Sequence, residues 1–304
     1  MRIKSTGPAL LIAALLLSLS LPALGADTFT YNPPDGTRYL LTVKNTSTYA
    51  ADSKTIMQGV GLARSRFSIQ KTGSGWTAVK IPISLSMKVD NKNFNDPSSK
   101  ILEGIIVTYD ILPGGALAVI KGYENLDEKI SETYTGDLAE SVSAVISREI
   151  MEQTERLEWE KRITSFAGKN AQPGTTDIKM DSFNTPDGKK IEYFNAYKIA
   201  DSNEYPEPGL VRIDFCFSTD KRDIAEFFGR SVDDVFGAGT PFSDFSEITL
   251  EDFEGSGYRI IDPGTMMIYH EYTKIETKIM MMLSPKVTKA VDMRREVEYS
   301  FEYK

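Results

Sequence analysis

The sequence has only one cysteine, Cys216, and one histidine, His270, in 304 residues. A disulfide bond within the chain is therefore impossible, and any zinc site that needs several Cys or His ligands is excluded. Proline and glycine are also sparse, at 14 and 22 residues, which excludes collagen-like and low-complexity chains. The 35 Lys and Arg residues are outnumbered by 43 Asp and Glu residues. Because nucleic acids bind basic surfaces, this balance argues against a nucleic-acid partner.

Long apolar runs are confined to the N-terminus. Basic residues precede an apolar run over residues 9–21, and small residues follow up to Gly25. This order is typical of a secretory signal peptide, residues 1–25, with cleavage after Gly25. A retained anchor is the alternative, although the run is shorter than the ~20 residues that span a bilayer. We therefore expect a mature chain, residues 26–304, that is periplasmic or secreted and has no stable membrane anchor.

Alternation of apolar and polar residues dominates the rest of the chain. The clearest apolar series is Val79, Ile81, Ile83, Leu85, Met87 and Val89, with mostly polar residues between its members. Similar alternation occurs over residues 39–43, 67–69, 105–111, 193–199, 211–217, 267–283 and 297–303. A period of two predicts half-exposed antiparallel strands, because parallel strands buried on both faces read as continuous apolar runs.

The pattern changes to a helical one over residues 125–168. Asn125 with Glu128, and Asp137 with Glu140, have the spacing of capping boxes. The apolar residues that recur at helical intervals are Leu138, Val142, Val145, Ile146, Ile150 and Leu157. A break near residues 135–136 predicts a short helix and then a long one, and a further short helix is expected over 219–228.

These patterns predict an α+β fold in which a strongly curved antiparallel β-sheet, a half-barrel, covers one long and one or two short α-helices. We expect residues 26–304 to form a single domain with a helical insertion at about 125–168. Two lobes divided near residue 175 are the alternative, because the chain is long for one sheet domain.

Motifs of catalysis are missing. The sequence contains no nucleophile elbow, phosphate-binding loop, dinucleotide fingerprint or zinc-protease motif. His270 lies in a strand-like stretch on the polar side, which favours a surface residue over a general base. We therefore predict a protein that is not an enzyme and that has no cofactor and no metal site. A hydrolase that uses a pair of carboxylates remains open, because carboxylates are plentiful.

Six of the eleven methionines lie between residues 266 and 293. Three interpretations compete: core packing, an adaptable lining for an apolar ligand, and capture of copper(I) by thioethers. In strand geometry Met280 and Met282 share a face and Met281 takes the other. As the lining of a ligand cavity we predict Val79, Ile81, Ile83, Leu85, Met87, Met267 and Met281.

Four segments carry a resemblance to known proteins. They are YNPPDGTRYLLTV at 31–43, VTYDILPGGALAVIKGYENLDEKI at 107–130, SGYRIIDPGTMMIYHEYTKIETKI at 256–279 and REVEYSFEYK at 295–304. Together they resemble a family of uncharacterised exported bacterial proteins whose domain has no assigned activity. The layout is more distantly similar to periplasmic carriers of lipoproteins and lipids. In those carriers a curved half-barrel sheet wraps helices and opens an apolar cavity, so the resemblance implies hydrophobic ligand binding.

Two hypotheses about function follow. The first is a non-enzymatic envelope protein that binds a lipid, a lipidated protein or another hydrophobic ligand in an apolar groove. The second is a structural or protein-interaction module that presents its polar sheet face and an acidic edge, residues 247–254, to an envelope partner. An apolar cavity of at least about 300 Å³, the lower bound for ligand pockets, would favour the first.

Overall fold

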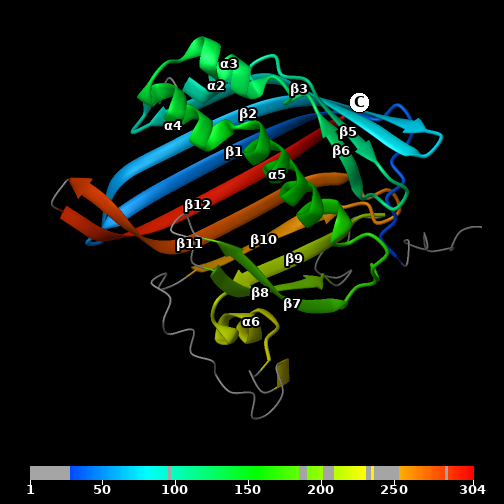
Figure 1. Cartoon of the computed structure of the whole chain (residues 1–304). Helices are drawn as coiled ribbons and strands as arrows, with labels where there is room; N and C mark the ends of the chain where they lie inside the picture. The colour runs from blue at the N-terminus through cyan, green and yellow to red at the C-terminus, as the bar shows by residue number, and fades with distance from the viewer. Residues whose placement is uncertain are drawn as a thin grey trace, which may run out of the picture.

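The computed structural model (Figure 1) describes residues 28–94, 97–184, 190–200, 209–230, 234–235, 253–284 and 287–304. The expected signal peptide lies outside these residues, as does most of the expected acidic edge. Within the described ranges, no helix is long and apolar enough to cross a membrane.

One antiparallel sheet of twelve strands is the main element of the described chain (Figure 1). The strands are β1 (Arg38–Ala51), β2 (Lys54–Thr72), β3 (Gly75–Val89), β4 (Lys92–Phe94), β5 (Val107–Ile111), β6 (Leu117–Lys121), β7 (Thr176–Asn184), β8 (Lys190–Ile199), β9 (Val211–Ser218), β10 (Phe253–Ile261), β11 (Ile268–Ser284) and β12 (Val287–Tyr303). Their order is β6-β5-β3-β2-β1-β12-β11-β10-β9-β8-β7, with β4 beside β3. The first and last strands therefore meet in the middle of the sheet, and β1 to β12 pairing joins the strands before residue 175 to those after it.

The helices are α2 (Pro97–Leu102), α3 (Leu126–Thr133), α4 (Asp137–Ile146), α5 (Arg148–Trp159), the π-helix η1 (Glu160–Thr164) and α6 (Lys221–Phe227). Helix α5 runs across one face of the sheet and continues into η1 (Figure 1). We call this sheet surface the helix face. Its residues include Lys80 of β3 and Glu271 of β11, which contact α5 and η1 respectively. The opposite surface is the outer face, and α6 packs there against Phe194, Ala196 and Cys216.

The predicted α+β class is wrong, because 54% of the described residues are in strands and 21% in helices. The fold is a sheet-dominated, open antiparallel one. The long helix expected after residue 136 is also wrong, since α4 ends at Ser147, whose backbone is extended (ψ 158°) and whose side chain caps α5. Leu157, expected in the buried stripe, is 47% exposed. The expected capping boxes are absent too: Asn125 makes no side-chain cap bond and Gly136 is the N-cap of α4.

The main core lies between the helices and the helix face. Aromatic rings fill its centre, where Tyr31 contacts Trp76 and Trp159 edge to face at ring-centroid distances of 5.2 and 5.8 Å. Helices α3 and α4 add Ile130 and Val142 to the same core. Such aromatic pairs contribute beyond their buried area, so they hold α5 against the sheet.

Candidate functional site

The apolar series of β3 does not share one face of the sheet. A register shift in the pairing of β3 with β2 leaves Ile83 without a partner, which is a β-bulge. Because a bulge exchanges the faces of the residues beyond it, Val79 and Ile81 lie on the outer face while Leu85 and Met87 lie on the helix face. Four side chains of the series, Ile81, Ile83, Leu85 and Met87, are 37–45% exposed. None of the five β3 residues predicted to line a cavity, Val79, Ile81, Ile83, Leu85 and Met87, lines either of the two cavities described next.

The methionines of the predicted lining are also separated. Met267 borders a cavity beside Met266. Met281 lies in β11, where its backbone is paired with Lys289 of β12. Of the six predicted lining residues whose side chains the structure describes, Met267 is thus the one that reaches the wall of cavity A or B.

Two cavities flank the helical segment formed by α5 and η1. Cavity A, of about 400 Å³, lies between α5 and the strands β1, β2 and β12. Its apolar wall includes Tyr39, Leu41, Val43, Phe67, Met151 and Phe301. Cavity B, of about 300 Å³, lies between η1 and the strands from β7 to β12. Its apolar wall includes Phe166, Tyr193, Phe215, Phe217, Ile275 and Val297.

The two cavities meet at a shared wall made by Glu158, Arg162, Arg295 and Tyr299. A further hollow of about 590 Å³, near α6, is lined mainly by polar and charged side chains. Cavities A and B are therefore the ones suited to an apolar ligand, and they are the candidate site.

Glycines of β10 form part of the floor beside cavity B. Gly257 and Gly255 occupy helix-face positions that pair with Phe215 and Phe217 of β9. A Cβ atom on Gly257 would overlap the carbonyl oxygen of Tyr272 and lie 2.7 Å from the ring of Phe215, and one on Gly255 would overlap the ring of Phe217. Since a real Cβ never comes this close, only glycine lets the two phenyl rings lie over the β10 backbone. The rings thereby cover the backbone and give the cavity an aromatic base.

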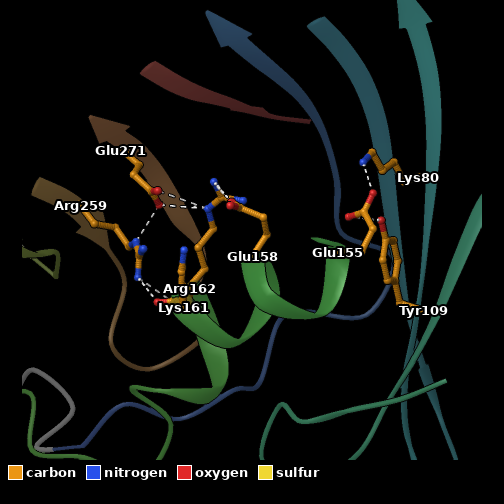
Figure 2. Close-up of polar contacts among 8 residues, drawn as sticks. All are labelled: Lys80, Tyr109, Glu155, Glu158, Lys161, Arg162, Arg259 and Glu271. Carbon is orange, nitrogen blue, oxygen red and sulfur yellow. Dashed lines mark hydrogen bonds and ion pairs between the residues drawn. The ribbon is translucent and has the colours of Figure 1, made fainter. Parts of the chain in front are cut away.

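A buried ion cluster joins η1 to the sheet (Figure 2). The Glu271 carboxylate accepts hydrogen bonds from Nε of Arg259 at 2.8 Å and from Nε of Arg162 at 3.1 Å. Arg162 also pairs with Glu158 at 2.8 Å, and its guanidinium lies 4.0 Å from the centre of the Tyr299 ring. Burial raises the pKa of Glu271, but the two arginines outweigh it and lower that pKa to about 2. The cluster therefore stays ionised at neutral pH.

Arg259 has a second role in this cluster. Its Nη1 donates to the carbonyl oxygens of Lys161 and Arg162, both at 3.2 Å (Figure 2). Carbonyl groups near the end of a helix lack partners within the helix. Arg259 thus connects η1 to β10 through backbone and side chain together, which fixes the position of the π-helix.

A second polar cluster fixes the middle of α5. The Glu155 carboxylate accepts from Nζ of Lys80 at 2.6 Å and from the Tyr109 hydroxyl at 3.0 Å (Figure 2). It also accepts from the Tyr123 hydroxyl at 3.0 Å. Burial raises the pKa of Glu155, yet the Lys80 charge and these hydrogen bonds lower it overall. Burial and then Glu155 raise the pKa of Tyr109. Carboxylates that are saturated in this way are typical of structural ion pairs rather than of a general base.

Sequence reasoning missed both clusters, although a signal for them exists. Met151, Trp159 and Ile163 continue an apolar stripe at helical spacing, and Glu155 and Arg162 interrupt it. A charge in such a stripe must find a partner in the core, because an unpaired buried charge is costly. His270, by contrast, lies in β11 as expected, with Nε2 3.9 Å from the Glu298 carboxylate.

Comparisons with known proteins are distant. No family model and no curated protein matches the sequence. Among solved structures, the chain is similar to lipovitellin, described as showing lipid-protein interactions, with a TM-score of 0.46 and 9% identity over 89% of this chain. It spans 25% of that chain. DynF from the dynemicin pathway of Micromonospora chersina gives a TM-score of 0.20 at 8% identity, covering 93% of this chain and 89% of DynF.

OccK5 (OpdH) of Pseudomonas aeruginosa gives a TM-score of 0.22 at 8% identity over 90% of this chain and 99% of that one. At these scores the likenesses carry no argument about function. The expected membership in a family of exported bacterial proteins stays a prediction. Among the described residues, no group of three or more metal-ligating side chains occurs.

Proposed function

We propose that this chain is an exported, non-enzymatic protein that binds a hydrophobic ligand between the α5–η1 segment and the sheet. The observation that carries the proposal is the pair of adjoining cavities of about 400 and 300 Å³, each with aromatic and aliphatic side chains in its wall. These volumes reach the range of small-molecule sites, about 300 to 1,000 Å³.

The two polar clusters support the proposal because they keep the cavities open. Glu155 and Arg162 are seven residues apart, so they anchor the helical segment at two points about 10 Å apart along its axis. A helix held in this way cannot settle onto the sheet and fill the space beneath it. Preformed space lowers the cost of ordering the site when a ligand binds.

The alternative function is a structural or protein-interaction module of the envelope, and one observation favours it. Apolar side chains of β3 and β4 are exposed, including Ile83 and Leu85 at 45% and Phe94 at 50%. Exposed apolar clusters mark contact surfaces for partners. Such a surface could coexist with an internal ligand, so the cavity must be tested directly.

The test is binding of N-phenyl-1-naphthylamine, an uncharged dye that fluoresces in apolar surroundings, to the protein and two variants. Val43 lines cavity A, and Val43→Trp fills part of it. Thr42→Trp, one residue earlier on the outer face of β1, is the matched control. We expect Val43→Trp to weaken dye binding about tenfold and Thr42→Trp to leave it unchanged.

The stability of Val43→Trp, measured by urea unfolding with circular dichroism as the signal, distinguishes an empty cavity from a filled core. An added ring costs about 1–3 kcal/mol in a packed core but little in empty space. If the protein binds no dye, the proposed site is wrong. It is also wrong if Val43→Trp strongly destabilises the protein while its folded fraction binds the dye as tightly as the unchanged protein does. Native mass spectrometry of the purified protein would show a ligand that is retained from the cell.

A further inference from the structure

Cavity B is basic although the protein as a whole is acidic. Its lining includes six cationic side chains, Lys161, Arg162, Lys169, Lys179, Arg259 and Arg295. It includes three anionic ones, Glu158, Asp177 and Glu271. The formal net charge of the chain is −8, so this excess of positive charge is local.

Most of these cations are neutralised within the cavity wall. Arg162 and Arg259 share Glu271, and Arg162 also pairs with Glu158. Lys169 pairs with Asp177 at 2.7 Å, and Lys179 pairs with Asp181 at 2.9 Å. The pairs use every carboxylate that lines the cavity.

Two cations remain without an ion pair in the described part of the chain, Arg295 and Lys161. Arg295 donates from Nε to the amide oxygen of Asn45 at 3.1 Å, which is a neutral acceptor. Lys161 is engaged through its backbone carbonyl, which accepts from Arg259, while its side chain is exposed. Both side chains border a cavity whose base is the rings of Phe215 and Phe217.

We propose that the ligand of cavity B is an anionic amphiphile with a single apolar chain, whose carboxylate or phosphate head group binds Arg295 and Lys161. This inference rests on the proposed function and names its ligand class. The chain of the ligand lies along the aromatic base, and the head group remains at the two exposed cations. Guanidinium and ammonium groups form charge-assisted hydrogen bonds to such head groups, which are about twice as strong as neutral ones.

The geometry explains why the head group binds here and not at Arg162. The Arg162 and Arg259 guanidinium groups already share a buried carboxylate, and a second anion beside Glu271 would be repelled. Arg295 has no such carboxylate, and it borders both cavities. A head group at Arg295 therefore stands where the two apolar spaces meet.

The experiment compares three competitors that have the same tail and differ in the head group: dodecanoate, dodecyl phosphate and dodecanol. Each competes with N-phenyl-1-naphthylamine below its micelle concentration, on the full chain and on the double variant Arg295→Gln with Lys161→Gln. Arg66→Gln, an exposed arginine on the outer face of β2, is the control. Because the dye and dodecanol are uncharged, they report the apolar cavity alone.

We expect at least one of the two anions to displace the dye about tenfold better than dodecanol, and the double variant to remove this preference while dodecanol is unaffected. Comparison of dodecanoate with dodecyl phosphate identifies the head group. If dye binds and the three compounds compete equally, or if the preference persists in the double variant, the inference fails and the proposed function stands. If no dye binds, both fail.

Discussion

The substitution Glu271→Gln tests whether the buried ion cluster fixes η1 to the sheet. Gln keeps the size of the side chain and one acceptor oxygen but removes the negative charge. Arg162 and Arg259, which share this carboxylate, would then face each other as two buried cations. Glu302→Gln, an exposed carboxylate on β12, is the control.

The magnitude follows from the pKa of Glu271, which is about 2 in the folded protein against an ordinary value of 4.5. Each unit of pKa corresponds to about 1.4 kcal/mol, so ionised Glu271 stabilises the folded state by about 3 kcal/mol. Loss of one partner of a buried ion pair costs about 3–5 kcal/mol. We therefore expect Glu271→Gln to lower the free energy of unfolding by about 3–5 kcal/mol at neutral pH.

The dependence on pH has a defined sign. Because the folded pKa lies below the unfolded one, the contribution is fully present above about pH 4.5 and is lost as the pH falls toward 2. At pH 3 about 1 kcal/mol of it remains. The difference between the protein and Glu271→Gln should thus shrink by about 2 kcal/mol between pH 7 and pH 3.

The assay is urea unfolding at the two pH values, followed by the fluorescence of Trp76 and Trp159, which both belong to or pack against the core. A loss below about 1 kcal/mol at pH 7 would refute the reasoning, since the control should change by less than about 0.5 kcal/mol. A difference of the same size at both pH values would refute it as well, because the charge of Glu271 would then not be the cause.

Two further predictions concern the floor and the second cluster. Gly257→Ala should destabilise the protein by about 1–3 kcal/mol in urea unfolding, because the new Cβ would overlap the backbone carbonyl oxygen of Tyr272 and lie 2.7 Å from the Phe215 ring. Gly73→Ala, with nothing within 4 Å of its Cβ, should leave the stability unchanged. An unchanged stability of Gly257→Ala would contradict the close packing of β10 at the floor of cavity B. Glu155→Gln should lower the free energy of unfolding by about 1–3 kcal/mol in the same assay, and Glu140→Gln, at an exposed position, should lower it by less than about 0.5 kcal/mol. Equal losses in the two variants would contradict the role of Glu155 in fixing α5 to the sheet.

Much of the sheet could be predicted from the sequence, because its strands bury one face and expose the other. The alternation over residues 39–43 and 297–303 corresponds to β1 and β12, which pair directly. The antiparallel arrangement inferred from this alternation is confirmed. Alternation within a strand does not depend on which strands are its neighbours, so it identifies strands even when the strand order is unknown.

The helical segment was predicted less well because its breaks are local. Gly136 has a positive φ of 59°, and Ser147 has an extended backbone, and the two residues divide a segment whose apolar periodicity is nearly continuous. Apolar periodicity indicates which face of a helix is buried, but it does not indicate where one helix ends and the next begins in a new direction. The fold class failed for a related reason, since short helices add little to a sheet of twelve strands.

The predicted cavity lining depended on an unbroken period of two along β3. The bulge at Ile83 breaks that period, so residues 79–81 and 85–87 end on opposite faces. A bulge is one extra residue in a strand relative to its paired strand. It can therefore be recognised only when β3 is aligned with β2. No property of β3 alone could therefore have placed Leu85 on the helix face.

The positive charge of cavity B could not be predicted from the sequence either, because its residues are far apart in the chain. Lys161 comes from η1 and Arg295 from β12, 134 positions later, and the rings between them come from β9. Net charge and charge runs average over such distances, which is why the acidic composition gave no hint of a basic cavity. What brings these groups together is the antiparallel register of β9 to β12 and the anchoring of η1 by Arg259. The ligand preference and the fixed position of η1 are therefore linked: a variant that frees η1 should lose the preference for anions before it loses the affinity for an uncharged dye.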